Sequence, residues 1–418
     1  MTRRASVIGL SLLLAVAVAA CGKSSSSGGG EQGGIKTGPG VTAKTIHLGV
    51  LTDLSGVFAP LGLAITQAEQ AYWKQQNAAG GVCNRKVVLS VKDHGYDPQK
   101  AVTLYRDMAP NILGLQQLLG SPVTAALLPQ LERDSMYSSL SAWPPSLLGS
   151  KVIEITGTTY DVEAINGVDW LMKNKGLKSG DAIGDLYFEG DYGEGGLKGI
   201  QYAAKKHGLK VVQQKIKATD TDMSGQVSAF KRAGVKAIWL TVGPKQLASA
   251  AGAAKAQGLN VPLAGNNPVF SPLLLGTAVG PILQKNLTVF TSTAPISYDK
   301  PDIAKAKAAY VKYYPKGTPQ AAVVSGWAES VVMNEVLQKA CAAKDLTRQG
   351  LVNALRKASN IDTGGVIAEP LDYTKLGEPP EKAVYATGID KNAAGGQKVI
   401  DGPFTSPTAK GYQVSASS

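Results

Sequence analysis

Short apolar segments alternate with helical segments from Thr45 onward, and this alternation constrains the fold more than any other feature. Ile46, Leu48 and Val50 recur with the two-residue period of a half-buried strand. The expected strands of this first set are Thr45–Leu51, Lys86–Val91, Ile112–Leu119 and Met136–Leu140. Strands connected through helices run parallel with right-handed crossovers, so we predict a doubly wound α/β sheet.

The alternation restarts after Lys151–Thr156 and predicts a second sheet. Its expected strands are Ala182–Phe188, Leu209–Gln214, Lys236–Thr241 and Val261–Ala264, again separated by helical segments. With 418 residues, the chain is longer than one compact domain usually is. We therefore predict two α/β lobes, with further helices near 303–313, 326–340 and 346–358.

The segment Gly120-Ser121-Pro122 joins an expected strand to an expected helix. Pro fits the first helical position because its missing N–H would be unpaired there, and Ser121 is then a natural N-cap. Ligands of doubly wound sheets bind beyond the carboxyl ends of the strands, which places Asp53, Ser121 and Ser141 along one rim. Ser121 either helps to hold an anionic group at this helix end or only caps its helix.

The charge of the chain identifies no macromolecular partner. The formal net charge is +12, and much of it comes from lysines dispersed over the expected helices. No dense basic run is interleaved with aromatic residues, so nucleic-acid binding has no support in the sequence. A solvated surface explains this charge better than attraction to an anionic membrane does.

The sequence lacks the usual motifs of catalysis and of cofactor or metal binding. It contains no HExxH, CxxC, P-loop or GxSxG pattern. His47, His94 and His207 lie far apart along the chain and indicate no metal site. The glycine cluster at 190–196 lacks the spacing of a dinucleotide-binding loop. We therefore expect no cofactor, no metal and no enzymatic activity.

The N-terminus carries the most specific signal in the sequence. Arg3 and Arg4 precede an apolar stretch at 7–18 that is too short to span a bilayer. The stretch leads into Val-Ala-Ala-Cys-Gly, which resembles the lipobox of bacterial lipoproteins. This resemblance implies a signal peptide over residues 1–20 and a lipid on the Cys21 thiol, and a plain secretory signal is the alternative. Residues 21–43 are rich in Ser and Gly and predict a flexible tether.

Two cysteines remain if Cys21 carries lipid. An extracytoplasmic location would permit a disulfide between Cys83 and Cys341. The two positions are far apart in sequence, and two unpaired buried thiols are the alternative. The sequence leaves both possibilities open.

Five short segments then follow one another in a specific order. They are TIHLGVLTDLSGVFAPLG at 45–62, NAAGGVCNRKVV at 77–88, HGYDPQKAV at 94–102, LGSPVT at 119–124 and DYGEG at 191–195. Together they resemble the branched-chain amino acid and amide family of ABC-transporter solute-binding proteins. The resemblance covers about 45–371, and the order and spacing of the motifs make it specific.

The resemblance implies the type I periplasmic-binding fold, in which three crossing segments join two lobes. The crossings would lie near 156–160, 291–295 and 361–365. The implied division is 44–157 plus 295–360 for lobe 1, 158–294 plus 361–405 for lobe 2, and 406–418 as a frayed tail. Ligand would bind between the facing rims, and the lobes would close over it by a hinge motion.

Several site residues follow from the same resemblance. In amino-acid-binding members, the serine matching Ser121 and the loop matching Ser141 and Ala142 hold the carboxylate and amine of the ligand. The tyrosine matching Tyr192 closes over the ligand from lobe 2. Trp143 lies beside the rim loop and is a candidate for an aromatic wall of the cleft.

Two features of amino-acid binders do not carry over. Val242 and the following glycine stand where those proteins place an aromatic residue, and Asn266 and Asn267 stand where they place an acid for the ligand ammonium. An amide cannot supply that negative charge, so a neutral amide, a polyol or a carboxylate without the amine fits better. Asp53 or Glu189 is a candidate for a replacement charge.

These observations lead to one functional prediction. We expect a monomeric, lipid-anchored solute-binding protein on the extracytoplasmic face of the cell membrane. It would capture a small polar solute, resembling an amino acid, an amide or a carboxylate, and deliver it unchanged to the permease and ATPase subunits of an ABC importer. The alternative is a ligand sensor of the same fold that signals to a membrane receptor.

Overall fold

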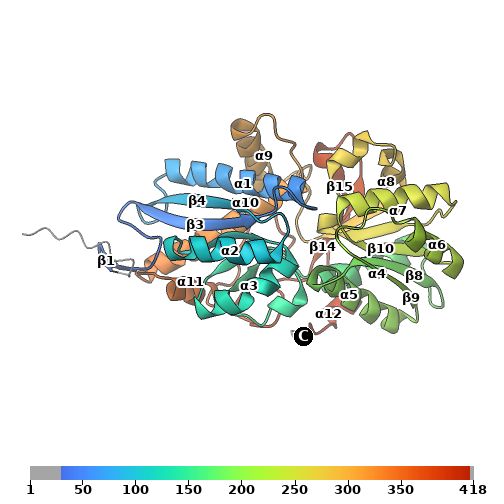
Figure 1. Ribbon diagram of the computed structural model, residues 1–418, viewed down its shortest axis with the longest axis horizontal. Helices are drawn as coiled ribbons and strands as arrows, with labels where there is room; N and C mark the ends of the chain where they lie inside the picture. Colours follow the sequence, from blue (N-terminus) through green and yellow to red (C-terminus); the bar gives the residue numbers. More distant parts are fainter. Residues whose placement is uncertain (1–29, 415–418) are drawn as a thin grey trace, which may run out of the picture.

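The computed structural model describes residues 30–414, which form two α/β lobes lying side by side along the long axis of the molecule (Figure 1). This arrangement confirms the predicted fold class of two doubly wound lobes. The expected signal peptide and the lipidation site Cys21 lie outside the described residues. Within 30–414, no helix combines the length and apolarity needed to cross a bilayer.

Five parallel strands form the sheet of lobe 1, in the order β4-β3-β5-β6-β7. They are β3 (Thr45–Thr52), β4 (Lys86–Asp93), β5 (Gly114–Leu119), β6 (Ser138–Ser141) and β7 (Ile153–Ile155). The chain moves outward from β3 to β4 and then returns past β3 to β5. The loops after β3 and β5 therefore flank the crevice where an open α/β sheet binds ligands.

Helices cover both faces of this sheet (Figure 1). They are α1 (Ala59–Ala78), α2 (Pro98–Met108), α3 (Ser121–Arg133), α9 (Pro301–Tyr313), α10 (Ala321–Ala342) and α11 (Arg348–Leu355). The long helices α1 and α10 pack against each other on one face, and α2 and α3 cover the other. Helix α2 begins where the sequence predicts, because the Asp97 carboxylate accepts the N–H groups of Gln99 and Lys100 and so caps its first turn.

Seven strands form the sheet of lobe 2, in the order β15-β14-β12-β11-β10-β8-β9, with β14 and β15 antiparallel to their neighbours. The strands are β8 (Ala182–Phe188), β9 (Lys210–Ile216), β10 (Ala237–Thr241), β11 (Leu263–Asn266), β12 (Leu287–Thr291), β14 (Val384–Ile389) and β15 (Gln397–Phe404). The helices are α4 (Tyr160–Lys175), α5 (Asp191–His207), α6 (Ser224–Ala233), α7 (Pro244–Ala256) and α8 (Gly280–Asn286). The loops after β8 and β10 flank the corresponding crevice of this lobe.

Three chain segments connect the lobes, and the third lies later than the sequence predicts. The first leads from β7 into α4, and the second follows β12. The expected third crossing at 361–365 is displaced, because the following residues still contact lobe 1. The Tyr373 hydroxyl, for example, donates to Glu154 of β7 at 2.9 Å and to the Ile155 carbonyl at 3.0 Å. The chain joins the sheet of lobe 2 only at β14.

The segment after residue 405 is ordered against lobe 2 up to residue 414, which corrects the expectation of a frayed tail. A short helix, α12 (Pro407–Lys410), packs on α4 and buries Ala409 completely. The N–H of Ser406 donates to Asn166 Oδ1 at 2.7 Å. The ring of Tyr412 packs on Tyr202, with centroids 4.6 Å apart. The buried alanine and the tyrosine ring explain why this segment stays in place.

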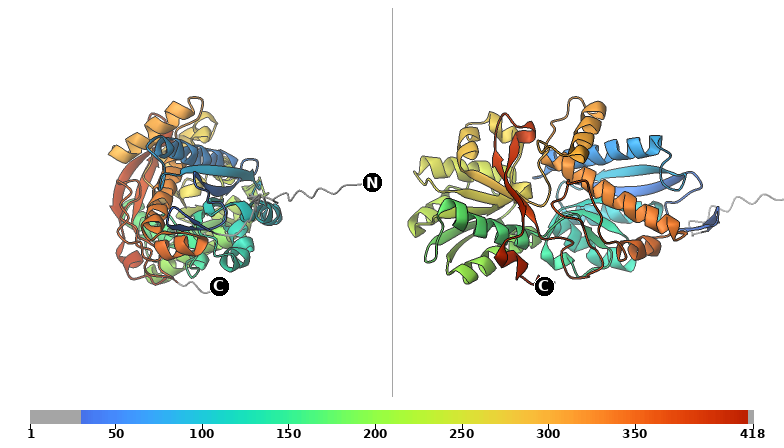
Figure 2. Two further views of the ribbon diagram at one scale, coloured as in Figure 1. Left: turned by 90° about the vertical axis from the view of Figure 1, so that its left-hand side faces the viewer. Right: turned by 180° about the vertical axis from the view of Figure 1, so that it is seen from behind.

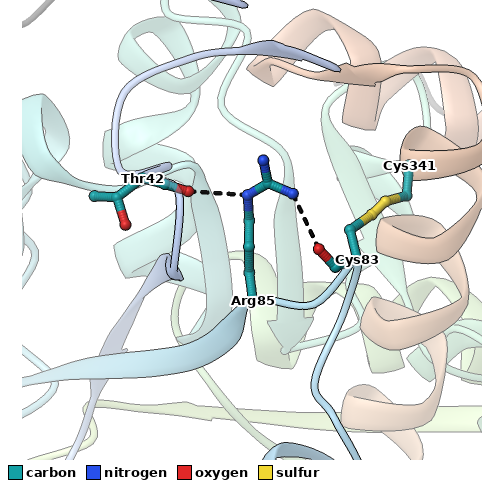
Figure 3. Close-up of a disulfide and its surroundings, with 4 residues drawn as sticks. All are labelled: Thr42, Cys83, Arg85 and Cys341. Carbon is teal, nitrogen blue, oxygen red and sulfur yellow. Dashed lines mark hydrogen bonds between the residues drawn. A yellow bond between two sulfur atoms is a disulfide. The ribbon is translucent and has the colours of Figure 1, made fainter. Parts of the chain in front are cut away.

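A disulfide between Cys83 and Cys341 joins the segment after α1 to the C-terminal end of α10 (Figure 3). The two Cα atoms lie 6.4 Å apart, within the usual range for a disulfide. Arg85 supports this end of the lobe, donating from Nε to the Thr42 carbonyl at 2.9 Å and from Nη1 to the Cys83 carbonyl at 3.1 Å. The disulfide therefore ties α1 and α10 together at the end of lobe 1 away from the carboxyl ends of the strands.

A small sheet closes the outer end of lobe 1. Strands β1 (Glu31–Gln32) and β2 (Ile35–Thr37) pair with each other, and β2 pairs with β13 (Asp345–Leu346), which follows α10. The first described residues therefore lie at the end of lobe 1 that is farthest from lobe 2 (Figure 2). The described part of the chain therefore starts far from the space between the lobes.

Candidate functional site

A cavity lies between the lobes, beyond the carboxyl ends of their parallel strands. Lobe 1 contributes side chains from α1, from the loops after β4, β5 and β6, and from the first turns of α10. Lobe 2 contributes the starts of α4 and α5, the loop after β11, and β15. Most of the lining side chains are aromatic or aliphatic, as is typical of small-molecule sites.

Ser121 lines this cavity at the start of α3, but it is not the N-cap that the sequence predicts. Gly120 occupies the cap position with a φ of +102°, and no side chain caps the helix. A Cβ on Gly120 would lie 2.8 Å from the Tyr96 ring, so the glycine lets that ring lie against the turn. Ser121 is 1% exposed, and within the described chain its hydroxyl has no hydrogen-bond partner of ordinary geometry. A ligand oxygen would relieve this unpaired hydroxyl.

Two buried glutamates lie behind Ser141. Glu329 of α10 lines the cavity, and Ser141 Oγ donates to both of its carboxyl oxygens at 3.0 Å. Glu69 of α1 shares a hydrogen bond with Glu329 and accepts another from Gln116 Nε2 at 3.4 Å. Burial and the nearby Glu154 raise the pKa of Glu329 to about 8, and burial and Glu329 raise the pKa of Glu69 well above its ordinary value. Both carboxyl groups are therefore mostly protonated at neutral pH.

Aromatic rings from both lobes meet at the cavity. Phe58 of lobe 1 lies edge-on to Tyr192 of lobe 2 with centroids 6.0 Å apart, and Tyr160 lies 4.8 Å from Tyr192. The Tyr192 hydroxyl donates within lobe 2, to Asn266 Oδ1 at 3.1 Å and to the Val242 carbonyl at 3.3 Å. The Tyr192 hydroxyl is thus hydrogen-bonded inside lobe 2, and the Tyr192 ring forms part of the cavity wall.

The remaining residues of the predicted site divide into two groups. Ser141, Trp143 and Asn267 line the cavity together with Ser121 and Tyr192. Ala142 and Asn266 do not line it: Ala142 is buried in the loop after β6, and Asn266 lies behind the Tyr192 hydroxyl. Asn266 therefore positions a wall residue and does not itself face the cavity.

Asp53 has a different role from the one considered for it from the sequence. Its buried carboxylate accepts hydrogen bonds from the backbone N–H groups of Ser55, Gly56 and Phe58. These contacts hold the turn that leads from β3 into α1 and positions Phe58. The carboxylate does not line the cavity, so it supplies no charge to a ligand there.

The aromatic residue missing from lobe 2 has a counterpart in lobe 1. A Cβ on Gly243, after β10, would lie 3.0 Å from Val57 Cγ2 and 3.6 Å from Phe58 Cε1. Phe58 therefore occupies space that an aromatic side chain from lobe 2 would need. The glycine lets the two lobes approach closely at this point.

Most of the lining residues are not predicted as site residues from the sequence; Glu329, Gln320 and Phe270 are examples. Helix α10 begins at Ala321, five residues before the expected start near Gly326, and its first turn thereby reaches the cavity. Glu329 did leave a signal, because it stands alone among apolar residues in the middle of a helix, and a buried glutamate needs a partner. Phe270 follows β11 in an irregular loop, where no local pattern reports the direction of a side chain.

The charges and ligating groups of the site limit what it can bind. Among the described residues, no Lys, Arg or His lines the cavity. Over 30–414, no group of three His, Cys, Asp or Glu side chains is placed to hold a metal ion. The cavity can therefore hold an organic solute through hydroxyl groups, a protonated carboxyl and apolar walls.

A model of the periplasmic binding protein family matches residues 45–396 of this chain. A solved structure, described as a fatty acid ABC transporter substrate-binding protein from Thermomonospora curvata, is 47% identical to it. That match covers 91% of this chain and 97% of the other, with a TM-score of 0.89. The similarity in sequence and in fold thus extends over nearly the whole of both chains.

Two further similarities are more distant. A branched chain amino acid ABC transporter protein from Thermus thermophilus, solved with bound valine, is 16% identical over 88% of this chain and 98% of its own, with a TM-score of 0.77. This likeness shows the fold alone. The Leu/Ile/Val-binding protein homolog 3 of Brucella melitensis is 24% identical over 201 residues, or 46% of this chain. The chain spans about half, 53%, of the length of that curated relative.

Proposed function

This chain belongs to the periplasmic binding protein family, and from that premise we propose that it is the solute-binding component of an ABC importer for a carboxylate with an apolar chain. The observation that carries the proposal is the cavity between the lobes, which combines mostly apolar walls with a buried, unpartnered hydroxyl at a helix N-terminus. The hydroxyl and the helix end favour an anionic head group, and the walls favour its hydrocarbon tail. The family is not enzymatic, so the solute would be released unchanged.

The walls support a fatty acid over an amino acid. Phe58, Trp143 and Phe270 offer apolar surface, and each CH₂ group buried against such surface contributes about 0.8 kcal/mol. Lobe 2 contributes no acid to the described lining, so a ligand ammonium would find no counter-charge there. The relative that is 47% identical is named for fatty acid transport.

Calorimetric titration and thermal shift with two ligand series test this proposal. The first series is saturated monocarboxylates from acetate to dodecanoate, and the second is free amino acids including valine. We expect affinity for the carboxylates to rise about fourfold per CH₂ until the cavity is filled, because each buried CH₂ contributes about 0.8 kcal/mol. Valine should neither bind nor stabilise. Tighter binding of valine than of decanoate would overturn the proposal.

We further propose that a lipid on Cys21 anchors the protein on the extracytoplasmic face, where it works as a monomer with permease and ATPase subunits. The lipobox-like residues and the Ser/Gly-rich segment support this, as does the disulfide, since such bonds persist in oxidising compartments. The first described residues lie far from the cavity, so a tether there would leave the cleft free (Figure 2).

Fractionation of the native host tests the anchor. The wild-type protein should sediment with membranes, and the Cys21→Ser variant should appear in the soluble fraction. A Ser24→Ala variant, changed in the same Ser/Gly-rich segment but keeping Cys21, is the matched control. Equal partition of the wild-type and Cys21→Ser proteins would contradict the anchor.

A further inference from the structure

The inner end of the cavity is formed by a carboxyl group whose surroundings disfavour its ionised form. Glu329 is fully buried apart from the cavity, and it is faced by Glu69 from α1, Glu154 from β7, Tyr137 before β6 and Tyr160 at the start of α4. None of these neighbours is a cation. Ionisation of Glu329 would therefore place a negative charge among other acids and phenols, away from water.

The groups around the neighbouring acid Glu154 do not supply a positive charge to Glu329. Glu154 already accepts hydrogen bonds from the hydroxyl groups of Tyr373 at 2.9 Å and Thr156 at 2.6 Å. Arg356 lies near Glu154, but it donates to backbone carbonyls of that region. The Arg356 guanidinium therefore binds backbone carbonyls and does not line the cavity.

The carboxyl group of Glu329 is hydrogen-bonded inside lobe 1 and also lines the cavity. Ser141 Oγ donates to both carboxyl oxygens, and Glu69 shares a further hydrogen bond with the group. Because Glu329 lines the cavity, a ligand oxygen held there can also accept the proton of its carboxyl group. The same cavity contains the buried hydroxyl of Ser121, which lies beside the Tyr160 hydroxyl and makes no hydrogen bond of ordinary geometry, an independent sign that a polar ligand group belongs there.

We propose that the neutral carboxyl of Glu329 donates a hydrogen bond to a carboxylate oxygen of the solute, so that this residue selects carboxylates over amines. The inference rests on the proposed function and identifies the donor that recognises the head group. No covalent bond forms: the ligand carboxylate and Glu329 share one proton, with Ser121 as a second donor. An ammonium ligand would instead require Glu329 to ionise, which reverses the dependence of binding on pH.

Titration of the protein with decanoate and with decylamine between pH 6 and pH 9.5 tests the proposal. Decanoate is ionised throughout this range, so a change in its affinity reports on the protein. If the proton of Glu329 is required, decanoate affinity should be constant at low pH and fall by about 30-fold by pH 9.5. The reason is that the protonated fraction of Glu329 falls about tenfold for each pH unit above its pKa of about 8. Decylamine should bind weakly at all pH values.

Three variants separate this role from a structural one. Glu329→Gln keeps an N–H donor, so decanoate should still bind but with an affinity independent of pH. Ser141→Ala removes a donor that favours ionised Glu329, so the fall in affinity should move to higher pH. Glu335→Gln, a half-buried position on the same helix outside the cavity, is the matched control and should behave as wild type. Thermal melts of all three verify folding.

The possible outcomes are distinct. A wild-type decanoate affinity that is flat with pH, or a Glu329→Gln variant with the wild-type slope, would overturn the role of Glu329 and leave the proposed function standing. An affinity for decylamine that rises with pH and exceeds that for decanoate would overturn both. The absence of decanoate binding at every pH would also overturn both.

Discussion

The two walls of the cavity differ in chemistry. Lobe 1 supplies the serines, Gln320 and the carboxyl group of Glu329, in addition to apolar side chains. Lobe 2 supplies three aromatic rings, two prolines and two amides, namely Tyr160, Tyr192, Phe270, Pro268, Pro272, Asn267 and Gln397. The serine hydroxyls and the acid thus belong to lobe 1, whereas lobe 2 contributes mostly rings and prolines, together with two amides.

This difference implies a division of work between the lobes. In lobe 1, the polar groups are held on α3, α10 and β6, which belong to or pack on one sheet and do not need closure to come together. In lobe 2, the rings lie in loops and first helical turns that meet lobe 1 when the cleft is closed. Head-group recognition would then be complete before closure, and closure would mainly bury the apolar tail. Four predictions test this difference, in order of expected effect.

The first prediction concerns the covalent support of lobe 1. Lobe 2 contains no cysteine, and the disulfide lies entirely in lobe 1. Replacing Cys83 and Cys341 by serine should lower the free energy of unfolding of lobe 1 by about 2–5 kcal/mol. Scanning calorimetry should show one transition shifted down, while decanoate affinity at 25 °C stays close to wild type. An unchanged melting profile would show that the disulfide does not stabilise the lobe.

The second prediction concerns the apolar wall of lobe 2. Phe270→Ala should weaken dodecanoate binding by about 1.5–3 kcal/mol, because a buried phenyl contact is lost. Butyrate, whose tail is too short to need that wall, should lose much less. Titration with both ligands gives the difference, and Phe230→Ala, at a buried lobe 2 position outside the cavity, is the control. Equal losses of binding free energy for the two ligands would show that Phe270 of lobe 2 does not cover the hydrocarbon tail.

The third prediction concerns the polar wall of lobe 1. Ser121→Ala should weaken all carboxylates alike by about 1–3 kcal/mol, or 5- to 150-fold, since each loses the same donor. Ser138→Ala is the control, because Ser138 is a buried serine of the same lobe whose hydroxyl donates to the Met136 carbonyl. A loss that grew with chain length would place the tail, and not the head group, at Ser121.

The fourth prediction distinguishes a structural acid from one that serves the site. Asp53→Asn should cost about 0.5–1.5 kcal/mol of unfolding free energy, because an amide keeps only one oxygen to accept the three backbone N–H groups. Its effect on decanoate binding should not depend on pH. Chemical denaturation and titration at two pH values measure the two quantities. A pH-dependent loss of affinity would indicate that the Asp53 carboxylate acts on the ligand and contradict its purely structural role.

The architecture of each lobe could be predicted because it depends on local periodicity. The segments Thr45–Leu51 and Ala182–Phe188 show their burial in their own residues, and they appear as β3 and β8. The rims could also be located, because the carboxyl ends of parallel strands must lie at one edge of a sheet. Cys83 and Cys341 show the limit, since only the packing of α1 against α10 brings them together.

The direction of individual side chains could not be predicted. Asp53 ends a strand at the rim and looked suitable for a ligand, but nearby backbone N–H groups hold its carboxylate in the turn. Glu329 lies in a helix far along the chain, and it reaches the cavity only because α10 starts early and packs across lobe 1. In each case the deciding contacts come from neighbours that a local pattern does not report.

The disulfide also affects how the chain is connected when it is cut. Its two cysteines are 258 positions apart, so they close a covalent ring that contains α4 to β12, the larger part of lobe 2, and the first two connections between the lobes. A protease that cuts a loop of lobe 2 between α4 and β12 would leave the fragments linked through sulfur. On a non-reducing gel the nicked chain would remain one species, and only a reductant would separate its halves. A single cut between α4 and β12 would therefore not separate lobe 2 from lobe 1.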